Sequence, residues 1–252
     1  MDVQLPDLFA SFLSGLKYLP NTCILAFVPL AVGLFLGSLI ALARIYNIPF
    51  LGRFCGIFVS VYSGIPAVVA LLVYNLLFLT KFNNIASFFG SSLTVRNVNP
   101  IYVALFTFTL AESTLLSETV RGALLSVDRG QIEAGYSIGL TSGQIFRRII
   151  LPQMLPVFIP TFTNSVVGAV KNTSIVMTIG VMDVLNGASV PAELTYRFLE
   201  GYIAAAVIYW AVNALLEYLL KIAERYTGKF RSCEEKGGNT NDRSEKYKKI
   251  IR

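Results

Sequence analysis

Long apolar stretches dominate the hydrophobic pattern of this chain. Residues 21–43 and 54–80 contain no Asp, Glu, Lys or Arg. Each stretch is long enough to cross a bilayer, which requires about 20 predominantly apolar residues. Three further apolar stretches, at residues 101–127, 154–182 and 201–220, contain a few ionisable residues. The pattern therefore predicts five membrane-spanning segments.

The five segments are predicted to be helices. A backbone in hydrocarbon must satisfy its own hydrogen bonds, and these segments lack the alternation over about ten residues that is typical of membrane β-strands. Pro29 and Pro66 are compatible with membrane helices, because neighbouring groups compensate for a missing backbone donor. The sequence thus predicts an all-α integral membrane protein whose transmembrane domain covers residues 21–225.

Two further regions flank this predicted domain. The apolar positions in residues 1–20 repeat at helical spacing, which predicts an amphipathic extracytoplasmic lead-in that lies in the membrane interface. A plain lead-in to the first helix is the alternative. Asp2 and Asp7 argue against a cleaved signal peptide, whose first residues are positively charged. Residues 226–252 are polar and basic, and they are predicted to form a disordered cytoplasmic tail.

The distribution of charge along the chain predicts how the protein is oriented in the membrane. Only 14% of the residues are charged, whereas about 25% is typical of soluble domains. One orientation of five spans places most of the 21 Lys and Arg residues on one side: Arg44, Arg53, Arg121, Arg129, Arg147, Arg148 and those at positions 221–252. The other side receives Lys17, Lys81, Arg96 and Arg197. The N-terminus is therefore predicted to lie outside and the C-terminus in the cytoplasm, so the net charge of +6 requires no nucleic acid as a partner.

Several kinds of chemistry are missing from the sequence. The chain has no His, which removes Ser–His and Cys–His nucleophile pairs and most metal sites. Its three Cys residues show no metal-binding spacing. It also has no Gly-x-x-x-x-Gly-Lys-Ser/Thr phosphate loop, so any ATP must bind to another chain. We therefore expect a protein that is not an enzyme and that holds no cofactor or metal.

The longest predicted cytoplasmic connection, residues 126–152, has structure of its own. Residues 131–138 are predicted to form a short helix that ends in a turn at Gly139, and residues 142–150 a second short helix. Pro152 and Pro156 are expected to limit the continuation of the second helix into the fourth span. Two helices joined at a Gly would present a compact surface to a soluble partner.

The spacing of particular residues in this loop follows a motif: Glu133, Ala134, Gly135, Gly139, Ile149, Leu151 and Pro152. It resembles the EAA loop of bacterial ABC-importer permeases, with Gly135 where that family usually has a second Ala. Further segments resemble landmarks of the polar amino-acid subfamily (histidine, glutamine, arginine and cystine type), at residues 63–66, 117–122, 130–131, 151–153, 164 and 171–174. Ser63 and Asn172 depart from the usual residues of that subfamily.

This resemblance implies the transmembrane domain of a type I ABC importer in a bacterial cytoplasmic membrane. Such an importer pairs two permease subunits, copies or paralogues, with two ATPase subunits and an extracytoplasmic substrate-binding protein. The EAA loop would act as the coupling helix that docks on the ATPase, and the chain would move polar amino acids by alternating access. Residues 126–139 are similar to cystine-type permeases, although this loop would contact the ATPase rather than the substrate. A secondary transporter or a channel remains the alternative function.

Individual loop residues have expected roles. Glu133 can pair with Arg147 or Arg148, or it can be a solvated surface acid. Ile145, Phe146 and Ile149 are expected to make apolar contacts, some with the ATPase and some with helices of this chain.

Charged residues at membrane depth are the main candidates for a substrate path, because they are costly in lipid. At a rise of about 1.5 Å per residue, Glu112 and Lys171 both lie roughly 16 Å below the outer face. They are predicted either to form a buried pair or to contact a substrate. Glu118 lies near the cytoplasmic end of its span and is predicted to pair with Arg121, three residues later.

Polar residues near Lys171 extend this candidate path. Thr161, Asn164 and Ser165 share a broad helical face with Lys171. A hydrogen bond between helices is the alternative role for Asn164. In the second span, the residues expected to line the same path are Gly64, Pro66 and Tyr74.

Overall fold

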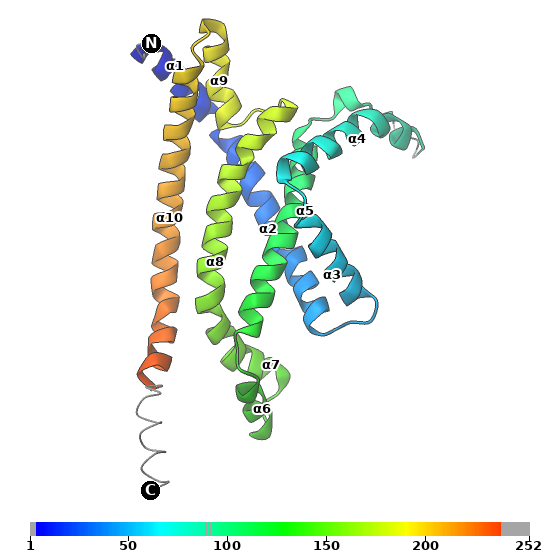
Figure 1. The fold of residues 1–252 in the computed structure, drawn as a ribbon, viewed down its shortest axis with the longest axis vertical. Helices are drawn as coiled ribbons and strands as arrows, with labels where there is room; N and C mark the ends of the chain where they lie inside the picture. Colours follow the sequence, from blue (N-terminus) through cyan, green and yellow to red (C-terminus); the bar gives the residue numbers. More distant parts are fainter. Residues whose placement is uncertain (1–3, 89, 91, 238–252) are drawn as a thin grey trace. The chain divides into compact units, whose positions relative to one another are not determined.

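The computed structural model of the chain describes residues 4–88, 90 and 92–237, and within this part every regular element is helical (Figure 1). The elements in chain order are α1 (Leu5–Lys17), α2 (Leu19–Ile45), α3 (Leu51–Tyr62), α4 (Ala67–Phe88), η1 (Val95–Asn97), α5 (Ile101–Leu125), α6 (Arg129–Ser137), α7 (Ser142–Ile145), η2 (Phe146–Ile150), α8 (Leu151–Asn172), η3 (Thr173–Ile179), α9 (Val184–Thr195) and α10 (Phe198–Gly237). The chain forms two compact units. One contains Met1–Arg121 with Asn164–Glu217, and the other contains Gly122–Thr163 with Tyr218–Arg252.

Within the described residues, four helices are long and apolar enough to cross a membrane: Leu19–Ile45, Ala67–Phe88, Ser142–Ile179 and Phe198–Ile222. Helix α5 has 25 residues, but Glu112, Glu118 and Arg121 reduce its apolar character. The all-helical membrane class predicted from the sequence is therefore confirmed. The count of five spans and the orientation of the termini stay predictions.

The second predicted span, residues 54–80, is not one helix. It is divided into α3 and α4 by a turn at residues 63–66, where Gly64 and Ile65 donate to carbonyls only three residues earlier. Pro66 has no backbone N–H, and its ring disfavours helical geometry at Ile65. Helix α3 is consequently a separate helix of 12 residues, packed on the end of α2.

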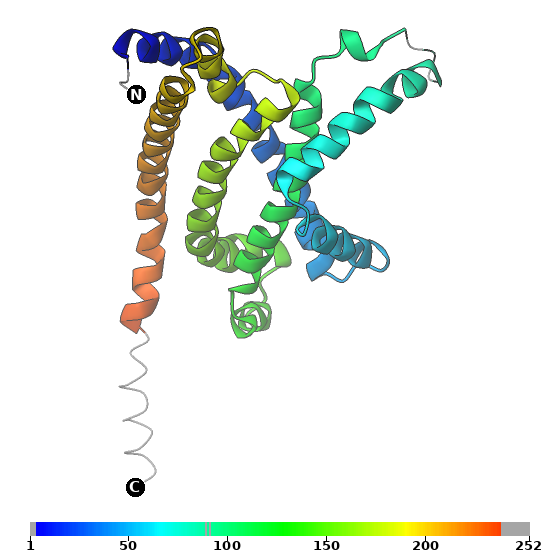
Figure 2. The ribbon, with the colours of Figure 1, turned by 45° about the horizontal axis from the view of Figure 1, so that its top comes forward.

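The amphipathic helix predicted in residues 1–20 is α1, which ends at Lys17 and packs along α9. Figures 1 and 2 both show the two helices side by side. The small residue Gly15 allows their close approach, and the hydroxyl of Ser14 donates to the carbonyl of Gly187 over 2.6 Å. Arg197, which follows α9, pairs with Asp7 of α1 at 3.3 Å. The location of α1 in the membrane interface stays a prediction.

Among the described residues, two apolar clusters lie in the interior of the first unit. One joins α2, α4, α5 and η3 through Leu25, Leu71, Ala104, Phe108, Val176 and Val181. The other joins α9 to α10 through Val184, Ala188, Ala204, Ala205 and Ile208. These clusters consist mostly of small and β-branched residues, which permit close contact between membrane helices.

Two helix ends differ from the sequence-based expectation. Pro152 and Pro156 do not separate the loop helix from the fourth span, because α7, η2 and α8 continue one into the next. The π-helical turn Phe146–Ile150 directly precedes Leu151 and Pro152, and the N–H of Leu151 donates to the carbonyl of Phe146, so the usual i→i−4 hydrogen bonding is already interrupted where the proline lacks its N–H. Helix α10 continues beyond residue 225 to Gly237, and the rest of the predicted tail, residues 238–252, lies outside the described residues.

Candidate functional site

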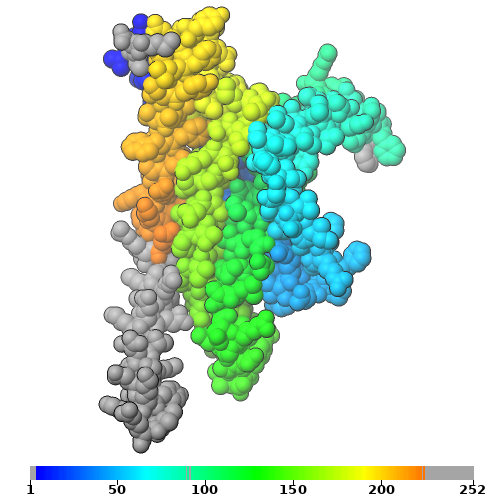
Figure 3. Space-filling model, viewed as in Figure 1, coloured from blue at the N-terminus to red at the C-terminus, as the bar shows by residue number. Residues whose placement is uncertain are grey.

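Local capping interactions shape the loop between α5 and α8. The carboxylate of Asp128 accepts from the backbone N–H of Gly130 over 2.6 Å and caps the start of α6. Thr141 and Gln144 form a reciprocal capping box at the start of α7. Between the two helices, Gly139 has a φ of +81°, a conformation that strongly favours glycine. The predicted helix–Gly–helix arrangement is therefore present, and its residues form a compact green lobe in Figure 3.

The inner face of this loop is closely packed. Ile145 is only 1% exposed. A Cβ at Gly135 would lie 2.9 Å from the Cδ1 atom of Ile149 and 3.1 Å from the Cγ1 atom of Ile145. The side chain of Gln153, at the start of α8, donates to that of Gln131 in α6. Gly135 therefore brings α6 close to the following helix, a role that its place in the sequence motif did not reveal.

The outer face of the loop exposes apolar side chains. Tyr136, Ile138 and Phe146 are 53%, 77% and 46% exposed. Of the three apolar residues expected to make contacts, only Phe146 is on this face, because Ile145 and Ile149 pack inward. Exposed apolar residues near a positive-φ turn form a surface that a partner protein can cover.

Glu133 also lies on the exposed side of the loop. Neither Arg147 nor Arg148 forms an ion pair with it in the described part of the chain, and all three side chains are exposed. Of the two alternatives for Glu133, the structure therefore shows the exposed surface acid and not the pair within the loop. Its carboxylate is therefore accessible to a partner that covers the loop.

The cytoplasmic end of α5 contains an ion cluster around Glu118. The expected pair with Arg121 is confirmed, at 2.8 Å. A second partner, Arg44 at the end of α2, lies 2.5 Å from the other carboxylate oxygen. Sequence reasoning missed Arg44 because it is 74 residues away in the chain and no local pattern links it to Glu118.

Glu112 and Lys171 do not form a pair. The side chain of Glu112 is 6% exposed and packs beside Gly33 of α2, and its Oε2 atom has no hydrogen-bond partner among the described residues. Lys171 is exposed, and no ion pair joins it to a carboxylate in the described ranges. The buried-pair alternative is therefore absent from this conformation.

The other candidates for the substrate path are partly brought together. Asn164 is exposed, as Lys171 is, and a spacing of seven residues puts them on one side of α8. Ser165 is buried and does not share this exposed face. Thr161, in the second unit, is exposed, and its hydroxyl donates to the carbonyl of Val157.

The candidates of the second predicted span lie on separate elements. Gly64 and Pro66 belong to the turn that separates α3 from α4. Tyr74 lies in α4, where its ring meets that of Phe106 of α5 edge-on, with the centroids 5.5 Å apart.

A buried polar network that the sequence analysis did not identify surrounds Asp183. This carboxylate caps α9 through the N–H of Asn186 at 2.9 Å and accepts a hydrogen bond of 2.6 Å from the hydroxyl of Tyr209 in α10. The Tyr209 hydroxyl also lies 3.2 Å from that of Thr173. Burial raises the pKa of Asp183, and the hydrogen bonds from Tyr209 and Asn186 oppose this shift. An Asp directly before the apolar start of a helix is a capping signal that could have revealed part of this network.

The sequence of the chain matches a known family over most of its length. Residues 33–229 match the family described as "Binding-protein-dependent transport system inner membrane component". The chain belongs to this family. The permease is therefore a multi-pass component of a transport system in the cytoplasmic membrane, and its family consists of transport proteins rather than enzymes. Its relatives are named as ABC transporter proteins, so this transport system is an ABC importer.

Curated relatives cover most of the permease. It is 36% identical to the L-cystine transport system permease protein TcyL of Bacillus subtilis (strain 168), over 82% of this chain and 84% of the relative. It is 32% identical to the probable amino-acid ABC transporter permease protein PatM of Vibrio harveyi, over 80% and 86% of the two chains.

Solved structures share the fold. A crystal structure of an amino acid ABC transporter with histidines superimposes with a TM-score of 0.74 at 26% identity, covering 90% of the permease and all of that chain. The MetNI methionine ABC transporter, in an inward-facing conformation, gives a TM-score of 0.65 at 18% identity, over 89% and 99% of the two chains, which shows the fold alone.

Proposed function

We propose that the permease imports polar amino acids by alternating access, driven by ATP hydrolysis on a separate ATPase subunit. The observation that carries this proposal is the outer face of the α6–α7 loop, which exposes Tyr136, Ile138 and Phe146 around the turn at Gly139. The EAA motif residues Glu133 and Ala134 are exposed on α6 beside them. Such a surface suits docking into a cleft of an ATPase.

The assembly that we propose has five spans per permease, an extracytoplasmic N-terminus and a cytoplasmic C-terminus. Two permeases, identical or paralogous, would bind two ATPase subunits on the cytoplasmic side and a substrate-binding protein on the outer side. The family description, which names binding-protein-dependent transport, supports this arrangement. Closure of the ATPase dimer would move the α6–α7 loop, and α8 continues directly from that loop towards the membrane.

Amino acids are the proposed substrate class because relatives with this function cover most of the chain. TcyL is named for L-cystine, and PatM for an amino acid that its name does not specify. Cystine is the specific substrate to test first, since TcyL and the permease are 36% identical over 209 aligned residues.

Uptake by the reconstituted complex tests the energy source. In proteoliposomes that contain the permease, its ATPase and its binding protein, uptake of radiolabelled cystine should require ATP and should persist when ionophores collapse ion gradients. An ATPase variant that binds but does not hydrolyse ATP should stop uptake. Ionophore-sensitive uptake with the hydrolysis-deficient ATPase would instead indicate a secondary transporter.

For the substrate path, we propose that Lys171 and Glu112 contact the charged groups of the amino acid. Lys171 is exposed on the same side of α8 as Asn164, whereas Glu112 has a buried carboxylate oxygen without a partner among the described residues. Opening of the path would have to expose Glu112 to the substrate. A buried carboxyl oxygen without a hydrogen-bond partner is costly, which is consistent with retention for function rather than for stability.

Neutral variants of these two residues should therefore lose transport and keep their stability. Lys171→Gln and Glu112→Gln should each lower uptake by at least about tenfold, since hydrogen bonds to charged groups contribute about 1.5–3 kcal/mol. Melting temperature and co-purification with the ATPase should stay at wild-type values.

The exchange Glu112→Lys with Lys171→Glu distinguishes substrate contact from a structural pair. It should not restore uptake, because the two side chains do not meet. If both single variants were unstable and the exchange restored their stability, the result would instead support a buried pair. Normal uptake by both single variants would show that neither Glu112 nor Lys171 belongs to the substrate path.

A further inference from the structure

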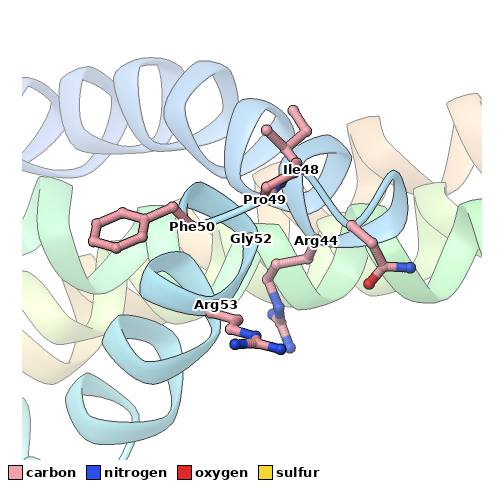
Figure 4. A pocket seen from close by; sticks show the side chains of 7 residues that line it. Arg44, Ile48, Pro49, Phe50, Gly52 and Arg53 are labelled. Carbon is pink, nitrogen blue, oxygen red and sulfur yellow. The ribbon is translucent and has the colours of Figure 1, made fainter.

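A hollow of about 700 Å³ lies where α2 turns into α3. Its lining consists of Arg44, Asn47, Ile48, Pro49, Phe50, Gly52 and Arg53 (Figure 4). The hollow lies entirely within the first unit, and neither the EAA motif nor the candidate substrate path includes any of its residues.

The backbone at this turn is held in an unusual conformation. Asn47 and Phe50 have φ angles of 48° and 68°, which are uncommon for residues other than glycine. The N–H of Ile48 donates to the carbonyl of Ala43 at 3.1 Å, and that of Gly52 donates to the carbonyl of Ile48 at 2.8 Å. A Cβ at Gly52 would lie 2.9 Å from the Ala43 carbonyl oxygen, so glycine is required for α3 to approach α2 this closely. Strained backbone that is held this firmly is common at binding sites.

The charged side chains that line this hollow are all basic, and one of the two has no acidic partner among the described residues. Its lining contains two Arg residues and neither Asp nor Glu. Arg44 is already bound to Glu118, which positions its guanidinium. Arg53 is exposed and forms no ion pair within the described residues. Figure 4 shows the Arg44 and Arg53 side chains reaching towards the same region. Two guanidinium groups at one place match the oxygens of a phosphate.

Apolar residues surround these two arginines. Phe50 is 90% exposed, and Phe54 and Ile57 on the following helix are 65% and 66% exposed. Exposed aromatic and aliphatic side chains next to basic residues are typical of a protein surface at the boundary between lipid headgroups and acyl chains. A free phosphate would use the arginines alone, whereas a phospholipid uses both features.

We infer that this hollow binds the phosphate of an anionic phospholipid in the cytoplasmic leaflet. Arg53 contacts the phosphate, Arg44 is held in place beside it by Glu118, and Phe50 and Phe54 contact the acyl chains. The inference rests on the proposed orientation, in which the α2–α3 turn is cytoplasmic, and anionic lipids are concentrated in that leaflet. It does not depend on ATPase coupling.

Lipid retention by the intact complex tests this inference independently of transport. The full-length permease, purified with its ATPase, is equilibrated with equal amounts of phosphatidylglycerol and phosphatidylcholine, and the bound lipids are counted by native mass spectrometry. The wild-type complex should retain phosphatidylglycerol preferentially. Arg53→Gln should reduce this preference about fivefold, since one basic residue near a membrane contributes about 1 kcal/mol. Arg53→Lys should keep most of it.

Arg96→Gln provides the matched control, because Arg96 is exposed on η1 and its removal changes the net charge equally. It should leave the preference unchanged, and an equal loss in Arg96→Gln and Arg53→Gln would overturn the inference. A large excess of inorganic phosphate should not displace the phosphatidylglycerol. Displacement would show a site for free phosphate and would also overturn the inference, as would equal retention of the two lipids by the wild-type complex.

Discussion

The Gly139→Val variant should insert into the membrane and bind its ATPase weakly or not at all, and ATP-driven uptake should fall by at least about tenfold. Gly139 has a φ of +81°, and strained backbone of this kind costs about 1–3 kcal/mol in other residues, with β-branched residues among the least tolerant. The loop can avoid this cost by changing the turn, which redirects α7 and the exposed Phe146 that follows it. Uptake and co-purification of the ATPase measure the effect.

Two further variants separate loop geometry from general strain. Gly90→Val introduces the same side chain at another positive-φ glycine, with φ +69° and no atom within 4 Å of the added Cβ, so it should keep near-normal coupling. Glu133→Lys reverses an exposed charge without changing the turn and should also weaken ATPase binding. Normal co-purification and uptake in both Gly139→Val and Glu133→Lys would contradict the assignment of this loop as the coupling element.

The second large effect is expected at the contact between α2 and α5. A Cβ at Gly37 would lie 2.8 Å from the Ser113 carbonyl oxygen and 2.8 Å from the Ser117 nitrogen. A Cβ at Gly33 would lie 2.7 Å from that of Glu112. Backbone atoms cannot rotate away as the end of a long side chain can. Gly37→Val should therefore destabilise the permease by at least about 3 kcal/mol, the upper part of the range for overpacked cores.

Gly122→Val is the matched control for this contact, because Gly122 lies in α5 with no atom within 4 Å of an added Cβ. The melting temperature in detergent and the yield of assembled complex should fall strongly for Gly37→Val and Gly33→Val, and they should stay near wild type for Gly122→Val. Wild-type melting temperatures for both Gly33→Val and Gly37→Val would show that α2 and α5 do not pack as described.

The sequence was sufficient wherever the deciding interactions are local. The lengths of the apolar segments follow from the thickness of the bilayer, so the class of fold could be predicted without knowledge of any contact. The α6–α7 loop was also predictable, because a cap at Asp128 and a turn at Gly139 depend only on residues a few positions apart. The pair of Glu118 with Arg121 is equally a consequence of one turn of helix.

Sequence reasoning was less successful at helix ends that contain proline. It treated residues 54–80 as one span, although Pro66 divides them into α3 and α4, and it expected Pro152 to end a helix that in fact continues to Ile179. A proline has the same local effect at both places. Whether the helix breaks at a proline depends on how the neighbouring segment packs. After α3 the chain turns and begins a separate helix, whereas after the π-helical turn at Phe146–Ile150 it continues as helix α8.

Tertiary structure alone decided which way each helix faces. The rise per residue predicts the depth of Glu112 and Lys171, and it placed them at one level. Rotation about the helix axis is set by packing against neighbouring helices, and it turns Glu112 towards Gly33 while Lys171 remains exposed. The same packing brings Arg44 to Glu118 and Tyr209 to Asp183. Such contacts join residues far apart in the chain, so their geometry depends on the whole arrangement of helices rather than on any local pattern.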